Sequence, residues 1–180
     1  MKTELDILKD VTEKLEKINI SYMLTGSLAM MHYAQPRMTR DIDLVIELNK
    51  PLIETFVETF SNDYYISADA VSDSVEHSFM FNLIHLKSSV KVDCIIRKQE
   101  EYRVVEFNRR EKIKFSGIDI FIVSKEDLIL SKLVWAKDSE SELQVRDIKS
   151  LLNTGYDKDY LFEWATKLNL YDFLMSLKDE

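Results

Sequence analysis

Hydrophobic and polar positions follow two different periods along the chain, and these periods predict its helices and strands. Over residues 4–18, apolar side chains recur at helical spacing with charged residues between them, as in an amphipathic helix. Over residues 41–47, apolar residues occupy every second position from Ile42 and several residues are β-branched, which predicts a strand. The same reasoning predicts strands at 22–24, 79–86, 90–96, 104–115 and 118–123, and helices at 28–33 and 52–60.

The period changes after Ser124 and then stays helical. Ser124 precedes Asp127 at the spacing of an N-terminal capping box. Further helices are expected at 141–152 and 158–168, with a short segment at 173–177. The chain is therefore expected to have an α/β or α+β fold, in which a mixed sheet occupies the first two-thirds and an all-helical part follows.

Composition limits the class of protein. The 180 residues are 46% hydrophobic and include 9 Phe, 8 Tyr and 2 Trp, which is enough for a packed core and unlike a disordered chain. The single cysteine excludes an internal disulfide framework and predicts a reducing, cytoplasmic compartment. The charged N-terminal segment predicts no signal peptide, and no apolar run is long enough to span a membrane. The net charge of −8 disfavours indiscriminate binding to nucleic acid.

The most informative chemistry lies in residues 22–47. A short strand leads into Gly26 and Ser27 at the start of a predicted helix, and the free backbone N–H groups of a helix N-terminus favour phosphate. Asp41 and Asp43 stand two apart on the next predicted strand, so both carboxylates leave the same face, with their Cα atoms about 6.6 Å apart. Oxygen ligands at this spacing suit Mg²⁺ or Mn²⁺. The alternative is a solvated strand face that keeps a sheet edge soluble.

A third carboxylate lies on another predicted strand. In residues 90–97, alternation places Asp93 on the face opposite Cys94, which is expected to be an inert core residue. An acid in the middle of an otherwise apolar strand needs a partner. Asp93 would join Asp41 and Asp43 if the two strands are neighbours. The alternative is a salt bridge to a lysine or arginine of an adjacent strand.

The order of these residues resembles a known signature. The Gly-Ser pair at 26–27 followed by Asp-Ile-Asp-Leu at 41–44 is similar to the Gly-Ser … Asp-x-Asp signature of the polymerase β-like nucleotidyltransferase superfamily. Residues 37–43 resemble the Arg-x-Thr/Ser-x-Asp-Ile-Asp version of bacterial minimal nucleotidyltransferases, abortive-infection (AbiEii-like) toxins and antibiotic-modifying nucleotidyltransferases. The helical stretch 130–148 resembles the C-terminal portion of the toxin-type members.

The resemblance implies a nucleotidyltransferase core with a mixed sheet in residues 1–123, and a helical region in residues 124–180 that closes a cleft. It implies that Asp41 and Asp43 hold Mg²⁺ (or Mn²⁺) against the nucleotide phosphates. It also implies that Asp93 completes this metal site and helps to deprotonate or orient the attacking hydroxyl.

Two cationic residues complete the site that the resemblance implies. The Gly-Ser pair would hold the triphosphate, while Arg37 or Lys132 would neutralise its charge. Each has an alternative: Arg37 as a surface salt-bridge partner of the acids, and Lys132 as a lysine that extends its amine from an apolar helix to water. Asp147, a further candidate, is expected to form a helix-surface ion pair beside Arg146.

Several functions remain open on these observations. The leading hypothesis is a Mg-dependent nucleotidyltransferase (EC 2.7.7 type) that moves a nucleoside monophosphate from an NTP to a hydroxyl of tRNA, a protein or a small molecule. It would act in a toxin–antitoxin or phage-defence system with a cognate antitoxin, or as an antibiotic-modifying enzyme. The alternatives are a catalytically silent nucleotide- or protein-binding module, against which the three intact carboxylates argue, and a soluble α/β domain whose acids have no catalytic role.

Overall fold

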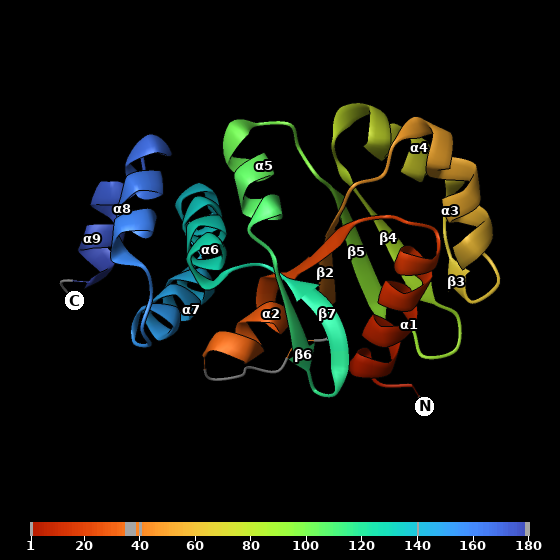
Figure 1. Cartoon of the computed structure of the whole chain (residues 1–180), viewed down its shortest axis with the longest axis horizontal. Coiled ribbons are helices and arrows are strands. Elements are labelled where there is room, and N and C mark those ends of the chain that lie inside the picture. The colour runs from red at the N-terminus through yellow and green to blue at the C-terminus, as the bar shows by residue number, and fades with distance from the viewer. Residues whose placement is uncertain (1, 35–38, 40, 140, 179–180) are drawn as a thin grey trace.

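A mixed β-sheet forms the centre of the protein (Figure 1). The computed structural model describes residues 2–34, 39, 41–139 and 141–178. Within these residues the strands are β1 (Tyr22–Thr25), β2 (Asp41–Ile46), β3 (Tyr64–Tyr65), β4 (Met80–His85), β5 (Lys91–Ile96), β6 (Glu111–Phe115) and β7 (Ile118–Ile122). They form a seven-stranded sheet in the order β3-β4-β5-β2-β1-β7-β6. β2 pairs with β5, and β1 with β7, in parallel; the other neighbours are antiparallel.

Helices connect the strands and then continue alone to the C-terminal end of the described chain. They are α1 (Glu4–Lys17), α2 (Gly26–Tyr33), α3 (Ile53–Phe60), α4 (Ala68–His77), α5 (Glu101–Asn108), α6 (Lys125–Ser139), α7 (Glu142–Leu152), α8 (Lys158–Lys167) and α9 (Tyr171–Lys178), with a 3-10 turn, η1 (Lys50–Leu52), before α3. Helices α6 to α9 gather beside the sheet (Figure 1). The division of the chain at residue 123 stays a prediction.

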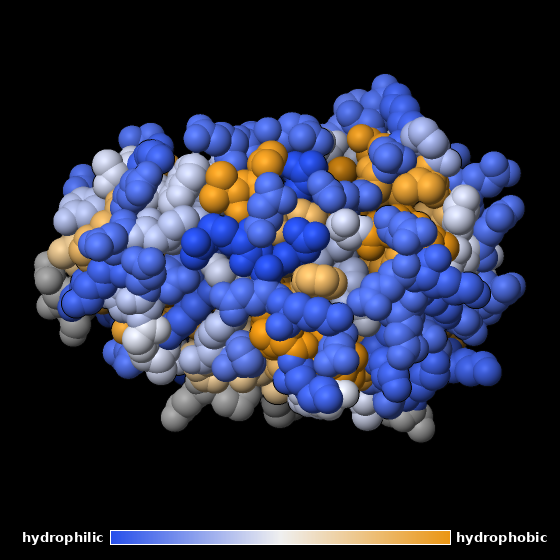
Figure 2. All heavy atoms as spheres, viewed as in Figure 1, coloured by the Kyte–Doolittle hydropathy of each residue, from blue (hydrophilic) through white to orange (hydrophobic). Residues whose placement is uncertain are grey.

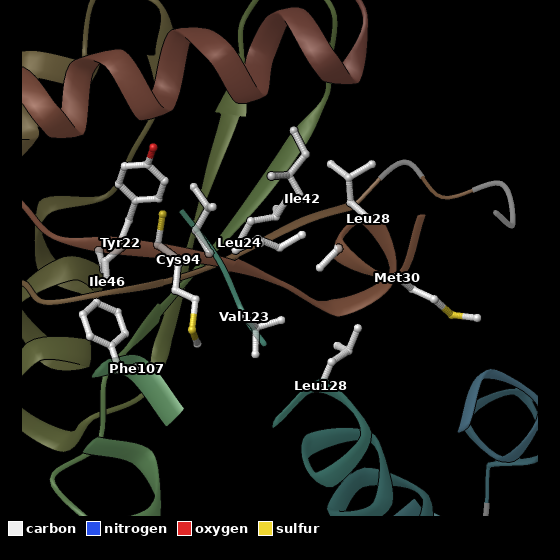
Figure 3. Close-up of a cluster of buried hydrophobic side chains, with 14 of the residues drawn as sticks. Tyr22, Leu24, Leu28, Met30, Ile42, Ile46, Cys94, Phe107, Val123 and Leu128 are labelled. Carbon is white, nitrogen blue, oxygen red and sulfur yellow. The ribbon is translucent and has the colours of Figure 1, made fainter. Parts of the chain in front are cut away.

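The core lies on both faces of the sheet. Ile42 on β2 is fully buried and, like Tyr22, points toward α1, whereas Phe107 and Leu128 come from α5 and α6 on the opposite face (Figure 3). Because side chains alternate along a strand, the residues of β2 that alternate with Ile42, Leu44 and Ile46 face the side of α5 and α6. That side carries the candidate site.

The structure confirms the α/β fold class and most elements expected from the sequence, with one error. The strand predicted over 104–115 is wrong in its first half, because residues up to Asn108 belong to α5. Val104 and Val105 favour a strand, but the packing of Tyr102 and Phe107, 5% and 1% exposed, overrides that local preference.

Helix α4 has no counterpart in the sequence prediction. It is capped by the Ser67 side chain, which accepts a hydrogen bond from the N–H of Ala70, and buries only Val71 and Ser74. Its apolar period is short, because Val71 and Val75 are its only large apolar residues, so the pattern does not single out a helix in the sequence.

The surface is largely polar. The face in Figure 2 is mostly hydrophilic, with separate hydrophobic patches rather than one continuous apolar area. Among the described residues, no helix combines the length and apolar character needed to cross a membrane.

Candidate functional site

Two aspartates lie side by side because two parallel strands are neighbours in register. β2 and β5 pair so that Asp43 stands opposite Asp93 and Asp41 stands opposite Lys91. The expectation that the two acidic strands are neighbours is therefore confirmed. Adjacent strands are about 4.8 Å apart, so Asp43 and Asp93 form one acidic group, with Asp41 two residues along the same face.

The amino end of α2 lies against this acidic group. Thr25, the last residue of β1, pairs with Asp43 across the antiparallel ladder, and α2 begins at the next residue, Gly26. Gly26 has a φ of +67°, and a Cβ atom added there would lie 2.0 Å from Oδ2 of Asp43. Only glycine satisfies both the left-handed backbone and the close approach. The start of α2, including Ser27, is thereby placed beside the carboxylates.

The surroundings of Asp43 disfavour its ionised form. Burial raises the pKa of Asp43 to about 6, and the nearby Asp93 and Asp41 carboxylates contribute to the same shift. The positive charges of Lys91 and Lys132 oppose it. Clustered carboxylates of this kind are stabilised by a cation.

Asp93 has protein donors on both of its carboxylate oxygens. Lys91 Nζ lies 3.0 Å from Oδ2, and Asn82 Nδ2 donates a hydrogen bond to Oδ1. The salt bridge considered for Asp93 exists, but its lysine belongs to the same strand and not to an adjacent one. Lys91 Nζ also lies 3.8 Å from Oδ1 of Asp41.

The donor set fits a divalent metal ion in chemical type. Asp41 and Asp43 supply hard carboxylate oxygens of the kind that Mg²⁺ prefers, and the raised pKa of Asp43 reflects its burial and, after that, the neighbouring carboxylates. In the part of the chain that the structure describes, no three acidic, histidine or cysteine side chains converge as a preformed metal site. Asp93, whose oxygens are held by Lys91 and Asn82, would have to release Lys91 to take part.

Lys132 is buried within the helical region. It is 4% exposed, and its Nζ donates to Oδ2 of Asp147 at 2.7 Å and to Oε1 of Gln144 at 3.1 Å. The alternative in which Lys132 extends its amine to water is wrong, because the amine has buried oxygen partners on α7. The surface pair predicted for Asp147 is wrong for the same reason, since Asp147 is 3% exposed. The charge of Lys132 opposes, to a small extent, the rise in the pKa of Asp43, so α6 carries a cation toward the acidic group.

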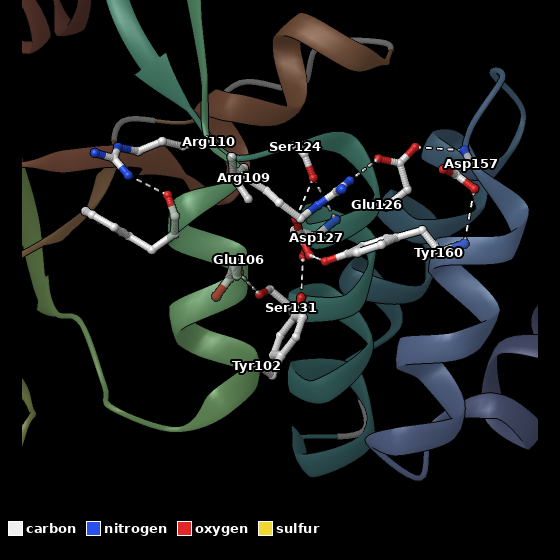
Figure 4. Close-up of polar contacts among 12 residues, drawn as sticks. Tyr102, Glu106, Arg109, Arg110, Ser124, Glu126, Asp127, Ser131, Asp157 and Tyr160 are labelled. Carbon is white, nitrogen blue, oxygen red and sulfur yellow. Dashed lines mark hydrogen bonds and ion pairs between the residues drawn. The ribbon is translucent and has the colours of Figure 1, made fainter.

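A second buried polar network holds α6 in place (Figure 4). Asp127 is fully buried; its carboxylate accepts hydrogen bonds from Tyr160 Oη at 2.7 Å and Ser124 Oγ at 2.6 Å. Arg109 Nε, at the end of α5, lies 3.1 Å from the same carboxylate. The network joins α5, α6 and α8, and so fixes the helix on which Lys132 stands. The predicted capping pair is confirmed, since Ser124 Oγ accepts from the N–H of Asp127.

The site therefore combines most of the candidates named from the sequence. Asp41, Asp43, Asp93, Gly26 and Ser27 come together where β1, β2 and β5 meet α2, and the charge of Lys132 reaches them from α6.

Other residues were missed by sequence reasoning or are not described. Arg37 and Arg40 lie outside the described residues. Lys91, Asn82 and Gln144 were not candidates. Lys91 shares a face with Asp93 two residues later, a signal that could have identified it, whereas Asn82 and Gln144 carry no such local signal.

The comparisons agree on the type of fold. A family model described as "Nucleotidyltransferase of unknown function (DUF6036)" matches residues 3–169. No curated protein matches the chain in sequence.

Three solved structures are similar in fold. An antigenic nucleotidyltransferase-like protein from Paracoccidioides brasiliensis has a TM-score of 0.55 and 21% identity, over 83% of this chain and 76% of that chain. The lincosamide antibiotic adenylyltransferase LnuA has a TM-score of 0.54 and 16% identity, over 82% and 94%. The antibiotic-resistance factor ANT(2'')-Ia has a TM-score of 0.52 and 13% identity, over 94% and 87%.

Proposed function

The chain belongs to the DUF6036 family of nucleotidyltransferases, and on this premise we propose that it transfers a nucleoside monophosphate from an NTP to a hydroxyl acceptor. The observation that carries this proposal is the register of Asp43 with Asp93 beside the amino end of α2. This arrangement places a metal-binding acidic group and a phosphate-binding helix end at one point of the sheet.

Each part of the reaction has a candidate among these residues. Asp41 and Asp43 would hold Mg²⁺ or Mn²⁺, which when bound supplies Lewis-acid stabilisation of phosphate charge. The backbone N–H groups at the start of α2 would bind the triphosphate, because a helix N-terminus directs N–H groups and the positive end of its dipole toward an anion. Lys132 supplies positive charge from α6. Asp93 accepts the proton of the acceptor hydroxyl.

The chemical change is an in-line displacement. The acceptor oxygen forms a bond to the α-phosphorus, the bond from that phosphorus to the bridging oxygen breaks, and pyrophosphate leaves. The proton of the acceptor hydroxyl passes to Asp93. Catalysis then depends mainly on positioning and on charge stabilisation.

The proposal also concerns the kind of molecule that accepts the nucleotide. A macromolecular acceptor, tRNA or a protein, suits the toxin-type resemblance of residues 130–148, and a toxin of this kind would have a cognate antitoxin. The net charge of −8 favours a protein or a small molecule over nucleic acid. The similarity to antibiotic adenylyltransferases is one of fold, so a small-molecule acceptor is an outcome of the test.

Transfer of label tests the function directly. The protein is incubated with Mg²⁺, cell lysate and each NTP labelled at its α-phosphate, and the labelled species is then identified as tRNA, protein or small molecule. The Asp41→Asn/Asp43→Asn double variant is the control, and its lysate should acquire no label. If no NTP yields label with the unmodified protein, the transferase proposal fails and a silent nucleotide-binding module is favoured.

A further inference from the structure

Lys91 occupies a special place in the acidic group. It stands opposite Asp41 on the neighbouring strand and two residues before Asp93 on its own strand. Its Nζ lies 3.0 Å from Asp93 Oδ2 and 3.8 Å from Asp41 Oδ1. A single ammonium group therefore lies near an acid on β2 and an acid on β5.

This ion pair differs from the other lysine pairs on the surface. The side chain of Asp93 is 10% exposed while that of Lys91 is 40% exposed, so a nearly buried carboxylate depends on a lysine that reaches in from solvent. Asn82 holds the other oxygen of Asp93. Because a buried carboxylate is costly without a counter-charge, Lys91 supplies the charge that the acidic group requires when no other cation is present.

We propose that Lys91 is a built-in cation that competes with a divalent metal ion for Asp93 and Asp41, so that metal binding requires the release of Lys91. The inference rests on the proposed function, since it assigns a role to the same acidic group. Lys91 is a positioning residue in this scheme. It keeps Asp93 in place before the metal arrives, and its flexible four-carbon side chain is then free to turn toward incoming phosphate.

If Lys91 competes with the metal ion, replacing Lys91 should change the affinity for metal in a way that loss of a purely structural salt bridge would not. Removing the ammonium group should strengthen metal binding, because the metal no longer has to break an ion pair. Partly exposed ion pairs contribute about 1 kcal/mol, which corresponds to a tightening of about fivefold. The difference in metal affinity between the unmodified protein and a variant without the ammonium group should decrease in concentrated salt, which screens the charge of Lys91.

Binding of Mn²⁺ alone tests the proposal without any turnover. The free ion is measured by electron paramagnetic resonance in titrations of the unmodified protein, Lys91→Met, Lys91→Arg and the control Lys167→Met. Lys167 also pairs with a carboxylate, that of Glu163 at 2.6 Å, and its side chain is 48% exposed. Lys167→Met thus causes the same change in net charge away from the acidic group.

We expect Lys91→Met to bind Mn²⁺ about fivefold more tightly, with Lys91→Arg and Lys167→Met close to the unmodified protein. Thermal unfolding of each variant establishes that it is folded.

Equal Mn²⁺ affinities for Lys91→Met and the unmodified protein would overturn the role of Lys91 and leave the proposed function standing. Equal tightening in Lys167→Met would overturn it too, because net charge alone would then be the cause. If neither the unmodified protein nor Lys91→Met binds Mn²⁺, both the competition and the metal-dependent function fail.

Discussion

A Cβ atom on Gly26 would lie 2.0 Å from Oδ2 of Asp43, so the backbone at the start of α2 and the central carboxylate of the site are in direct contact. This contact joins the helix end that we propose to bind phosphate to the acid that we propose to bind the metal ion. A side chain at position 26 would have to displace Asp43. Glycine is therefore required here by the position of Asp43 as well as by the backbone turn.

Gly26→Ala is therefore expected to be more harmful than an ordinary glycine replacement. Gly117 also has a positive φ, +86°, but nothing lies within 4 Å of its added Cβ. Gly117→Ala should lower the free energy of unfolding by about 1–2 kcal/mol through backbone strain alone. Gly26→Ala should lower it further, because the new Cβ atom displaces Asp43. Chemical denaturation of both variants measures the difference. In an Asp43→Ala background the extra cost at position 26 should decrease, and equal losses at both glycines would contradict the contact.

Asp43→Asn is expected to stabilise the metal-free protein in a pH-dependent way. Burial and the neighbouring acids raise the pKa of Asp43 to about 6, above its value of about 3.9 in an unfolded chain. The folded state therefore binds a proton between these values while the unfolded state does not, so ionised Asp43 destabilises the fold above about pH 6. The advantage of Asp43→Asn should be full above pH 6, decline as the pH falls, and vanish near pH 4.

Unfolding by denaturant in the presence of a chelator, at several pH values, measures this advantage. Asp119→Asn on β7, which replaces an exposed carboxylate, serves as the control and should show no such profile. A stability difference at position 43 that stays constant with pH, or that grows as the pH falls, would show that the carboxylate does not carry the predicted penalty.

Asp93→Asn should separate binding from chemistry. The amide keeps the shape of the side chain but cannot accept the proton of the acceptor hydroxyl. Transfer is expected to fall by about 10² or more, the scale of a lost general base, while NTP affinity changes only a few-fold. Affinity and turnover are measured on the same sample. Retained turnover would reduce Asp93 to a structural partner of Lys91 and Asn82, and loss of binding alone would place it among the nucleotide-holding residues.

The buried pair of Lys132 and Asp147 should be more important for stability than the surface pairs. Both side chains are 4% exposed and their charged atoms lie 2.7 Å apart. Asp147→Asn removes the carboxylate that lies against the ammonium of Lys132 and should lower the free energy of unfolding by about 3–5 kcal/mol. The double variant Lys132→Met/Asp147→Leu should recover most of that loss, because neither charge of the pair remains buried. Chemical denaturation of the single and double variants checks this, with Glu163→Gln on α8 as a control of little effect. Additive losses in the double variant would contradict the pairing.

The sequence alone determined the local geometry of the acidic strand. The recurrence of apolar residues at every second position from Ile42 places Ile42 in the core and Asp41 and Asp43 together on the other face, because successive side chains of a strand point to opposite sides. Gly26 was identifiable for a similar local reason, since it stands where a strand passes directly into a helix. These inferences depend on residues close together in the chain.

Only the tertiary structure decided which distant residues meet. That β5 lies next to β2 in parallel, with Asp93 opposite Asp43, follows from the order of strands in the sheet, which no local period encodes. The burial of Lys132 against Asp147 and the helical state of Val104 and Val105 were decided in the same way. Packing against elements far away in the sequence outweighs local preferences of at most about 1 kcal/mol per residue, and that packing exists only once the chain has folded.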